Sequence, residues 1–329
     1  MKSETAVFFC ALLAAPLLAG PPQRDHPAPP ADAVGQPQPT YILDRERVLI
    51  QTLSEMERTQ PDTPQAATLL NNLGTIYQEM GRYESAERSY KRSIQTWKAI
   101  PHVDPFHIAR PICNLSSLYL ENFMFAQAER LELRRIGGVL AEQHPHDDLT
   151  ARIHNNIAFL ELRKDRARQA EQAWLTALSI WEDAGPETLS VVQTLNNLTY
   201  FYKQQGRQAD AEVMARRGLD AAARLIAAGG ENQLWLLAMS AAIQVEIRDL
   251  RGAKVSSQRA LSLAEKALGP HHPDTARFLL LHADILEKTH DGDAAKRFRA
   301  RGMAILEGTY FGEMKRHTVD FTELGESFR

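Results

Sequence analysis

The sequence predicts an all-α fold, a solenoid built from six tandem helical hairpins between residues 61 and 308. Three columns of residues, each repeating every 41 or 42 positions, carry this prediction. The first is an alanine column: Ala86, Ala128, Ala170, Ala211, Ala253 and Ala295. The second is an asparagine column upstream of it: Asn72, Asn114, Asn156 and Asn197. The third is an aliphatic column downstream: Ile94, Ile136, Leu178, Leu219, Leu261 and Met303. A fixed period shared by independent columns indicates repeated units that each pack only on their neighbours.

Residues 1–19 are typical of a secretory signal peptide. Lys2 supplies a short positive start, and the run from Ala6 to Ala19 is uncharged and mostly apolar. This run is too short to span a bilayer as a helix, but it suits the core of a signal sequence. We therefore expect cleavage after Ala19 and export to a periplasm or to the medium. The alternative is a buried helix of the mature fold.

The next segment, residues 20–40, is predicted to be a linker because seven of its residues are prolines. Proline lacks the amide donor that a packed element needs. Residues 41–60 follow as a capping helix for the first repeat, since Ile42, Leu49, Leu53 and Met56 lie on one helical stripe. The residues after the repeats, 309–329, leave the period and form a C-terminal tail of open role.

Each repeat is expected to contain two helices. In the first copy, Leu69, Leu73 and Ile76 recur at helical spacing before Gly81 ends the run, and Tyr83 opens a second stripe. Proline marks several starts, because its missing amide would be unpaired in a first helical turn anyway. The expected repeats are 61–102, 103–143, 144–184, 185–228, 229–269 and 270–308.

The first copy, NNLGTIYQEMGRYESAERSYKRSI, resembles the tetratricopeptide repeat. The family's characteristic residues are all in place: Leu73, Gly74, Tyr77, Gly81, Tyr83, Ala86 and Tyr90. The 42-residue period and the opening HHPDTARFLLLHADIL of the last copy are similar to the longer variant found in kinesin light chains. The resemblance implies a right-handed α-solenoid whose inner wall, lined by the first helix of every unit, is the usual binding surface.

The matching positions on the first helices are, by this resemblance, the candidate partner-binding groove. They are Asn71, Asn72, Arg110, Asn114, Arg152, Asn155, Asn156, Arg163, Asn196, Asn197, Tyr200 and Lys203. Amide side chains both donate and accept, so a ladder of them can satisfy an extended peptide backbone, and arginines beside it favour carboxylates. The alternative is that the asparagines tie adjacent helices together and the arginines are solvated or paired. Trp235 and Phe278, on the apolar last copies, could equally be core between repeats.

Composition and motifs exclude several other classes of function. A formal net charge of -3 and a pI near 6.4 give no electrostatic reason to expect nucleic acid or an anionic membrane as a partner. We also expect no stable membrane insertion after signal cleavage. The histidines His144, His146 and His154 match no standard zinc spacing. No catalytic motif, phosphate-binding loop or cofactor motif is present, so we expect no catalytic, cofactor-binding or metal residues.

The sequence therefore predicts an exported scaffold that binds a protein or peptide in its groove. The alternative is a structural accessory subunit of an envelope or secretion complex that grips no linear peptide. A hydrolase with an unrecognised site is the reading that the sequence favours least. The identity of the partner and the oligomeric state stay open, because repeats of one fold serve many tasks.

Overall fold

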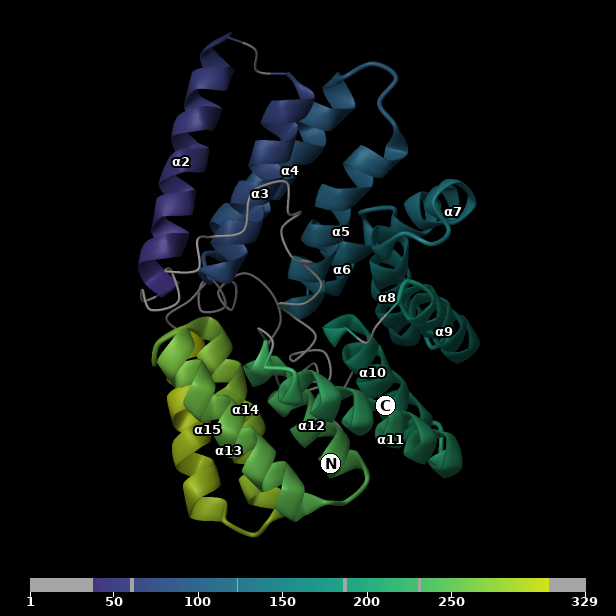
Figure 1. Cartoon of the computed structure of the whole chain (residues 1–329), viewed down its shortest axis with the longest axis vertical. Helices are drawn as coiled ribbons and strands as arrows, with labels where there is room; N and C mark the ends of the chain where they lie inside the picture. The colour runs from purple at the N-terminus through teal and green to yellow at the C-terminus, as the bar shows by residue number, and fades with distance from the viewer. Residues whose placement is uncertain (1–37, 60–61, 123, 186–187, 230–231, 308–329) are drawn as a thin grey trace. The chain divides into compact units, whose positions relative to one another are not determined.

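The computed structural model describes residues 38–59, 62–122, 124–185, 188–229 and 232–307, all of it helical apart from turns (Figure 1). These residues form two compact units, an N-terminal unit that ends at residue 185 and a C-terminal unit that begins at residue 188. The signal peptide, most of the linker and the tail that the sequence predicts lie outside the described residues. None of the described helices is long and apolar enough to cross a membrane.

The N-terminal unit contains one long helix followed by three hairpins. Its helices are α2 (Gln38–Thr59), α3 (Pro64–Glu79), α4 (Tyr83–Ala99), α5 (Pro105–Glu121), α6 (Phe125–Glu129), α7 (Leu133–Gln143), α8 (Asp148–Arg163) and α9 (Ala167–Asp183). Each first helix packs on its own second helix and on the next first helix, as α3 does on α4 and α5. Helix α2 covers the free side of α3, where Leu53 joins Leu70 and Leu73 in one core cluster.

The C-terminal unit contains three further hairpins with the same packing order. Its helices are α10 (Leu189–Gln204), α11 (Gln208–Ala227), α12 (Gln233–Glu246), α13 (Leu250–Ala267), α14 (Pro273–Lys288) and α15 (Gly292–Glu307). The predicted fold class, an all-α solenoid of tandem helical hairpins, is thus confirmed.

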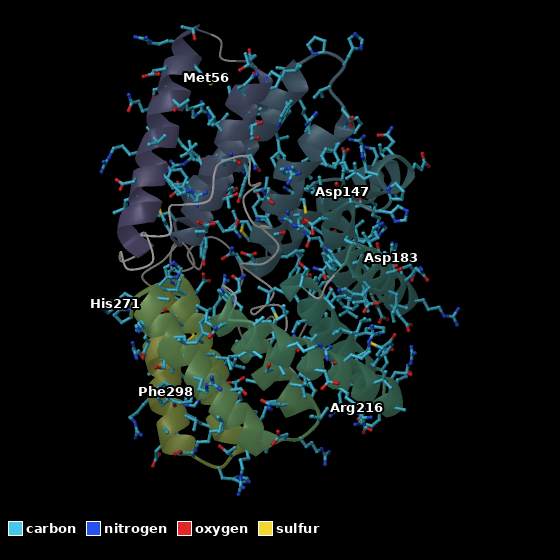
Figure 2. All side chains as sticks on the ribbon, viewed as in Figure 1. Met56, Asp147, Asp183, Arg216, His271 and Phe298 are labelled. Carbon is cyan, nitrogen blue, oxygen red and sulfur yellow. The ribbon has the colours of Figure 1, made fainter. Side chains whose placement is uncertain are left out.

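The helix starts are fixed by side chains that cap the first turn. The Thr63 hydroxyl accepts a hydrogen bond from the amide of Ala66, and Thr188 caps α10 in the same way. The carboxylates of Asp104 and Asp147 accept from amides of α5 and α8, and Figure 2 shows Asp147 at the start of α8. Each cap satisfies an amide that has no partner inside its helix, which explains why the starts coincide with the proline- and acid-rich openings of the repeats.

The alanine column is buried in every copy. All six alanines are at most 2 % exposed. In the first copy, the neighbouring Gly74 is pressed against the ring of Tyr90, and a Cβ built on Gly74 would lie 2.5 Å from that ring. A side chain larger than methyl at these positions would force the helices apart, so the column is required by packing.

The second hairpin departs from the expected pair of helices. Its second helix is broken into α6, of five residues, and α7, because Glu132 between them adopts a left-handed conformation with φ 55°. The expectation of two continuous helices per repeat is therefore wrong for this copy. No proline or glycine marks the break, so the sequence pattern carries no signal for it.

The turn between the two helices of a hairpin requires a left-handed residue. In the described residues this position is occupied by Gly81, Asp165, Gly206, Arg248 and His290, with φ between 56° and 71°. Glycine adopts this conformation without strain, whereas other residues pay roughly 1–2 kcal/mol for it. The two glycines sit in the first and fourth copies.

A buried histidine lies in the last hairpin. His282 on α14 is 2 % exposed, its Nδ1 lies 2.9 Å from the hydroxyl of Ser257, and its ring meets Phe298 edge-on. Burial lowers the pKa of His282; the Lys254 ammonium lowers it further, and the Asp291 carboxylate opposes the shift. The imidazole is therefore held neutral inside the C-terminal unit.

We predict that Gly206→Ala destabilises the protein by about 1–2 kcal/mol, because alanine must adopt the left-handed turn. The matched control is Gly138→Ala inside α7, where an added Cβ meets nothing within 4 Å. It should stabilise by about 0.5–1 kcal/mol, since glycine loses more backbone entropy in a helix than alanine. Urea unfolding of both variants makes the comparison, and a neutral Gly206→Ala would contradict the requirement for a left-handed residue.

We further predict that acid weakens the fold through His282. A histidine whose folded pKa lies below its unfolded value of about 6.5 contributes full stability above that value, and stability falls as the pH drops below it. His282→Gln, whose amide can still bond to Ser257, should flatten this pH dependence between about pH 7.5 and 5. The exposed His271 offers the control His271→Gln. Identical urea midpoints against pH for wild type and His282→Gln would refute the role.

Candidate partner-binding groove

The predicted groove residues lie on first helices of both units. In the N-terminal unit, α3, α5 and α8 carry them, and we call the surface of these three helices the first-helix wall. The wall holds Asn71, Asn72, Arg110, Asn114, Arg152, Asn155, Asn156 and Arg163. The remaining four, Asn196, Asn197, Tyr200 and Lys203, lie on α10 of the C-terminal unit.

Three of the predicted side chains form a hydrogen-bonded chain across the wall. The amide of Asn114 on α5 donates to the carbonyl oxygen of Asn71 on α3 at 2.9 Å. Arg152 on α8 donates from its guanidinium to the carbonyl oxygen of Asn114 at 2.8 Å. The three are 6 %, 4 % and 3 % exposed. The chain therefore joins three successive hairpins through groups that would be costly to bury without partners.

A second set of polar contacts runs beside this chain. Gln78 donates to the carboxylate of Glu121 at 2.8 Å and accepts from the hydroxyl of Tyr90 at 2.9 Å. Burial raises the pKa of the Tyr90 hydroxyl, which keeps it a neutral donor. Asn156 donates to the hydroxyl of Ser117 at 3.0 Å. The bonds of Gln78 to Glu121 and of Asn156 to Ser117 again link one repeat to the next, and for Asn156 this is the alternative role that the sequence left open.

The wall contains one cysteine, Cys113, which is buried on α5. Burial raises the pKa of its thiol, so the reactive thiolate is disfavoured. Among the described residues no group of three or more histidine, cysteine, aspartate or glutamate side chains could hold a metal ion. The chemistry that the wall offers is thus hydrogen bonding and charge.

Four of the twelve predicted residues are only half-buried: Asn72, Arg110, Arg163 and Lys203. Arg163 lies over the ring of Phe125, 4.6 Å from its centroid, and Arg110 lies over Phe106 at 5.8 Å. Burial and the neighbouring Arg152 lower the pKa of Arg110. Both arginines are therefore held by aromatic rings while part of each side chain faces solvent.

In the C-terminal unit, the first helices are tied by different contacts. The Lys203 ammonium on α10 donates to the backbone carbonyl of Glu246 at the end of α12. Burial raises the pKa of the Glu246 carboxyl, and the charge of Lys203 lowers it. Trp235 and Phe278 pack on each other with ring centroids 4.7 Å apart, and are 7 % and 1 % exposed. In this unit the two rings form core between α12 and α14.

The sequence analysis missed Arg277 on α14. Its guanidinium lies 3.0 Å from the carboxylate of Asp274, and the residue is 1 % exposed. Arg277 falls in the same column as Arg110 and Arg152, at a multiple of the repeat length. Extending the column of Arg110 and Arg152 to the last copy would have predicted a buried arginine at position 277.

Comparisons with known proteins were made by sequence and by structure. A family model described as tetratricopeptide repeat matches residues 47–99, 65–137 and 149–224. A search of curated proteins by sequence finds no match.

Three solved structures, two of them of Rap proteins, share the fold. A Rap protein in complex with competence and sporulation factor is 15 % identical, with a TM-score of 0.61, covering 82 % of this chain and 71 % of that one. The Rap conjugation regulator of plasmid pLS20, in complex with the Phr* peptide, is 14 % identical, with a TM-score of 0.60 and coverage of 81 % and 68 %. Aspartyl phosphate phosphatase F from Bacillus subtilis is 13 % identical, with a TM-score of 0.58 and coverage of 83 % and 69 %. At such identities the likeness shows the fold alone.

We predict that Asn114→Ala destabilises the protein by about 2–4 kcal/mol, because it leaves both Asn71 and the charged Arg152 without a buried partner. Asn72→Ala, at the adjacent half-buried position, is the control and should cost less than about 1 kcal/mol. Urea unfolding measures both. If Asn114→Ala were as stable as the wild type, the buried chain would not hold the repeats together.

Proposed function

This chain belongs to the tetratricopeptide repeat family, and from that premise we propose that it is an interaction scaffold that captures an extended peptide or protein segment on its first helices. The observation that supports the proposal best is the first-helix wall itself. Its buried amide chain fixes the spacing of α3, α5 and α8, and the half-buried side chains beside that chain are polar or basic.

Two structural neighbours with bound partners support this proposal. One Rap protein is described as complexed with competence and sporulation factor, and another as in complex with the Phr* peptide. Both are proteins of tandem helical hairpins with the fold found here. A third neighbour is named a phosphatase, but no catalytic motif in this sequence favours that activity.

The burial of the asparagines divides the proposed groove into two roles. Asn71, Asn114 and Arg152 hold the helices, as do the bonds of Asn156, and so prepare the surface rather than reach out from it. Asn72, Arg110 and Arg163 are the groups that a partner would contact in the N-terminal unit. Two arginines on aromatic supports favour a segment that carries carboxylates, because guanidinium and carboxylate form paired, charge-assisted hydrogen bonds.

Export remains part of the proposal, on the strength of the apolar run from Ala6 to Ala19 after Lys2. Sequencing the N-terminus of the native protein tests it, with Gly20 as the expected first residue. An intact Met1 would contradict export. The alternative function, an accessory subunit that assembles an envelope or secretion complex, would instead place the partner contacts away from the first-helix wall.

We predict that Arg110→Ala combined with Arg163→Ala weakens peptide binding by at least about 100-fold, since each charge-assisted contact contributes about 1.5–3 kcal/mol. The probe is the tightest acidic peptide selected from a displayed random library on the wild-type protein. The control is Arg135→Ala combined with Arg168→Ala, which removes two exposed arginines from second helices. Fluorescence anisotropy gives the dissociation constants. Equal binding by the groove variant, or failure of the library to yield any peptide, would argue for the accessory-subunit alternative.

A further inference from the structure

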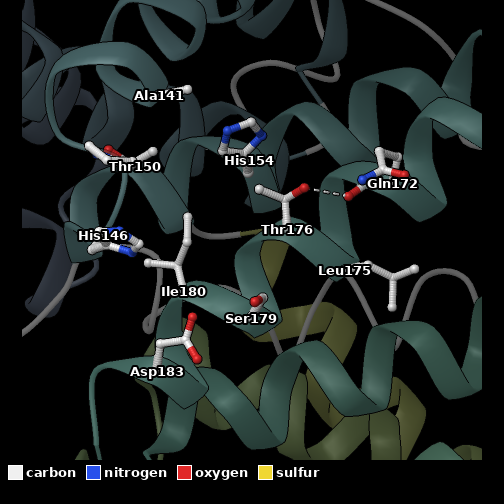
Figure 3. Close-up of a pocket in the computed structure, with 11 residues that line it drawn as sticks. Ala141, His146, Thr150, His154, Gln172, Leu175, Thr176, Ser179, Ile180 and Asp183 are labelled. Carbon is white, nitrogen blue, oxygen red and sulfur yellow. Dashed lines mark hydrogen bonds between the residues drawn. The ribbon is translucent and has the colours of Figure 1, made fainter.

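A pocket of about 380 Å³ lies at the third hairpin, and most of the residues that line it belong to the second helix of that hairpin, α9. Its lining comes from α7, α8, α9 and the loop before α8, all within the N-terminal unit (Figure 3). Ala141 lies at one edge, and Gln172, Thr176, Ser179 and Asp183 follow one another along α9. Pockets of this size can hold a side chain or a small ligand.

The floor of the pocket carries a polar residue where the other copies carry an apolar one. Sixteen residues before each column alanine stand Leu70, Ile112, His154, Leu195, Leu237 and Leu279. The five aliphatic members are buried core. His154 lines the pocket, and its Nε2 is shielded from solvent with no hydrogen-bond partner. Burial lowers the pKa of His154, so the ring stays neutral.

A second column of the repeats also has a different residue at the pocket. Six residues after each column alanine stand Arg92, Arg134, Thr176, Arg217, Arg259 and Arg301. Five copies therefore place an arginine on the second helix at the position where the third copy has Thr176. The hydroxyl of Thr176 bonds to the carbonyl of Gln172 on its own helix, and its side chain is too short to cross the pocket.

The last hairpin shows where the missing arginine would lie. Arg301 on α15 reaches back to the carboxylate of Glu265 and to the backbone carbonyl of Pro270. The counterpart of Pro270 in the third copy is Pro145, which lines the pocket.

The loops of the third and last copies agree in conformation. Thr150 bonds to the carbonyl of His144 at 2.7 Å, as Thr275 does to that of Gly269 at 2.8 Å. The pocket in the third copy thus corresponds to the space that the Arg301 side chain fills in the sixth.

The charges around the pocket suit a cation. Asp183 places a carboxylate at its rim, and Ser179 and Gln172 add a hydroxyl and an amide. None of the residues that line the pocket is a lysine or an arginine. The neutral ring of His154 adds a hydrogen-bonding nitrogen without repelling positive charge.

We propose that this pocket accepts the side chain of an arginine presented by a partner protein, in the space that corresponds to the one filled by Arg301 in the sixth repeat. The proposal does not depend on the first-helix wall. It assigns to the third repeat a second recognition site between α8 and α9, with Asp183 and His154 as the groups that contact the guanidinium.

The test is a titration of the full chain with Nα-acetyl-arginine methylamide, followed by NMR of the isotope-labelled methyl of Ile180, which lines the pocket. The matched probe is the citrulline analogue, which has the same shape and no charge. We expect a saturable shift in the millimolar range with the arginine probe and at least tenfold weaker binding of the citrulline probe. No saturable shift with the arginine probe, or equal binding of the two, would overturn the proposal.

Two variants introduce into the third copy the residue types that the other copies carry at these positions. Thr176→Arg returns the column arginine and should fill the pocket from within, so binding of the arginine probe should fall at least tenfold while the protein stays folded. His154→Leu returns the apolar floor and should also weaken binding, which keeps the test valid if one variant folds poorly. Ser262→Arg adds the same charge at an exposed position of α13 and should bind like the wild type. Undiminished binding by a folded Thr176→Arg would refute the site.

Discussion

The hydrogen-bonded chain from Asn71 through Asn114 to Arg152 is the interaction on which the rest of the N-terminal unit depends. A helical hairpin of this kind cannot bury its apolar faces alone, and each copy is stable only against its neighbours. Apolar contacts supply most of that stability but tolerate sliding. The hydrogen-bonded chain does not tolerate sliding, because a shift of α3, α5 or α8 would leave a buried polar group without a partner. The register of α3, α5 and α8, and hence the surface offered to a partner, follows from this chain.

In this arrangement, the residues that hold the helices together differ from those that we propose to bind the partner. The fully buried amides are committed to the neighbouring helix, whereas Arg110 and Arg163 keep part of their side chains at the surface while lying over aromatic rings. Charge held on a rigid support loses little conformational entropy when it meets a carboxylate, which favours binding. In the pocket of the third copy, two departures from the repeat pattern remove an arginine from α9 and place an imidazole on α8.

The architecture could be predicted from the sequence alone, but the roles of single residues could not. The alanine column and the capping residues such as Asp147 report local requirements of packing and hydrogen bonding, so the hairpins could be predicted from spacing. The break before α7 could not, because Glu132 carries no sequence signal for a left-handed turn. Nor could spacing tell whether Asn114 faces solvent or a neighbouring helix, since both arrangements place an asparagine at the same point of the period. His154 and Thr176 became informative only when the structure showed that both line one pocket.

The central claim, that the buried chain couples the repeats, is tested most directly by a double-mutant cycle on Asn114 and Arg152. Unfolding free energies of Asn114→Ala, Arg152→Ala and the double variant give the energy of the pair separately from the effect of each substitution. The account predicts a coupling of about 1–3 kcal/mol, because removing the second partner spares a group already left unsatisfied by the first change. Effects of the two substitutions that add within about 0.3 kcal/mol would contradict it.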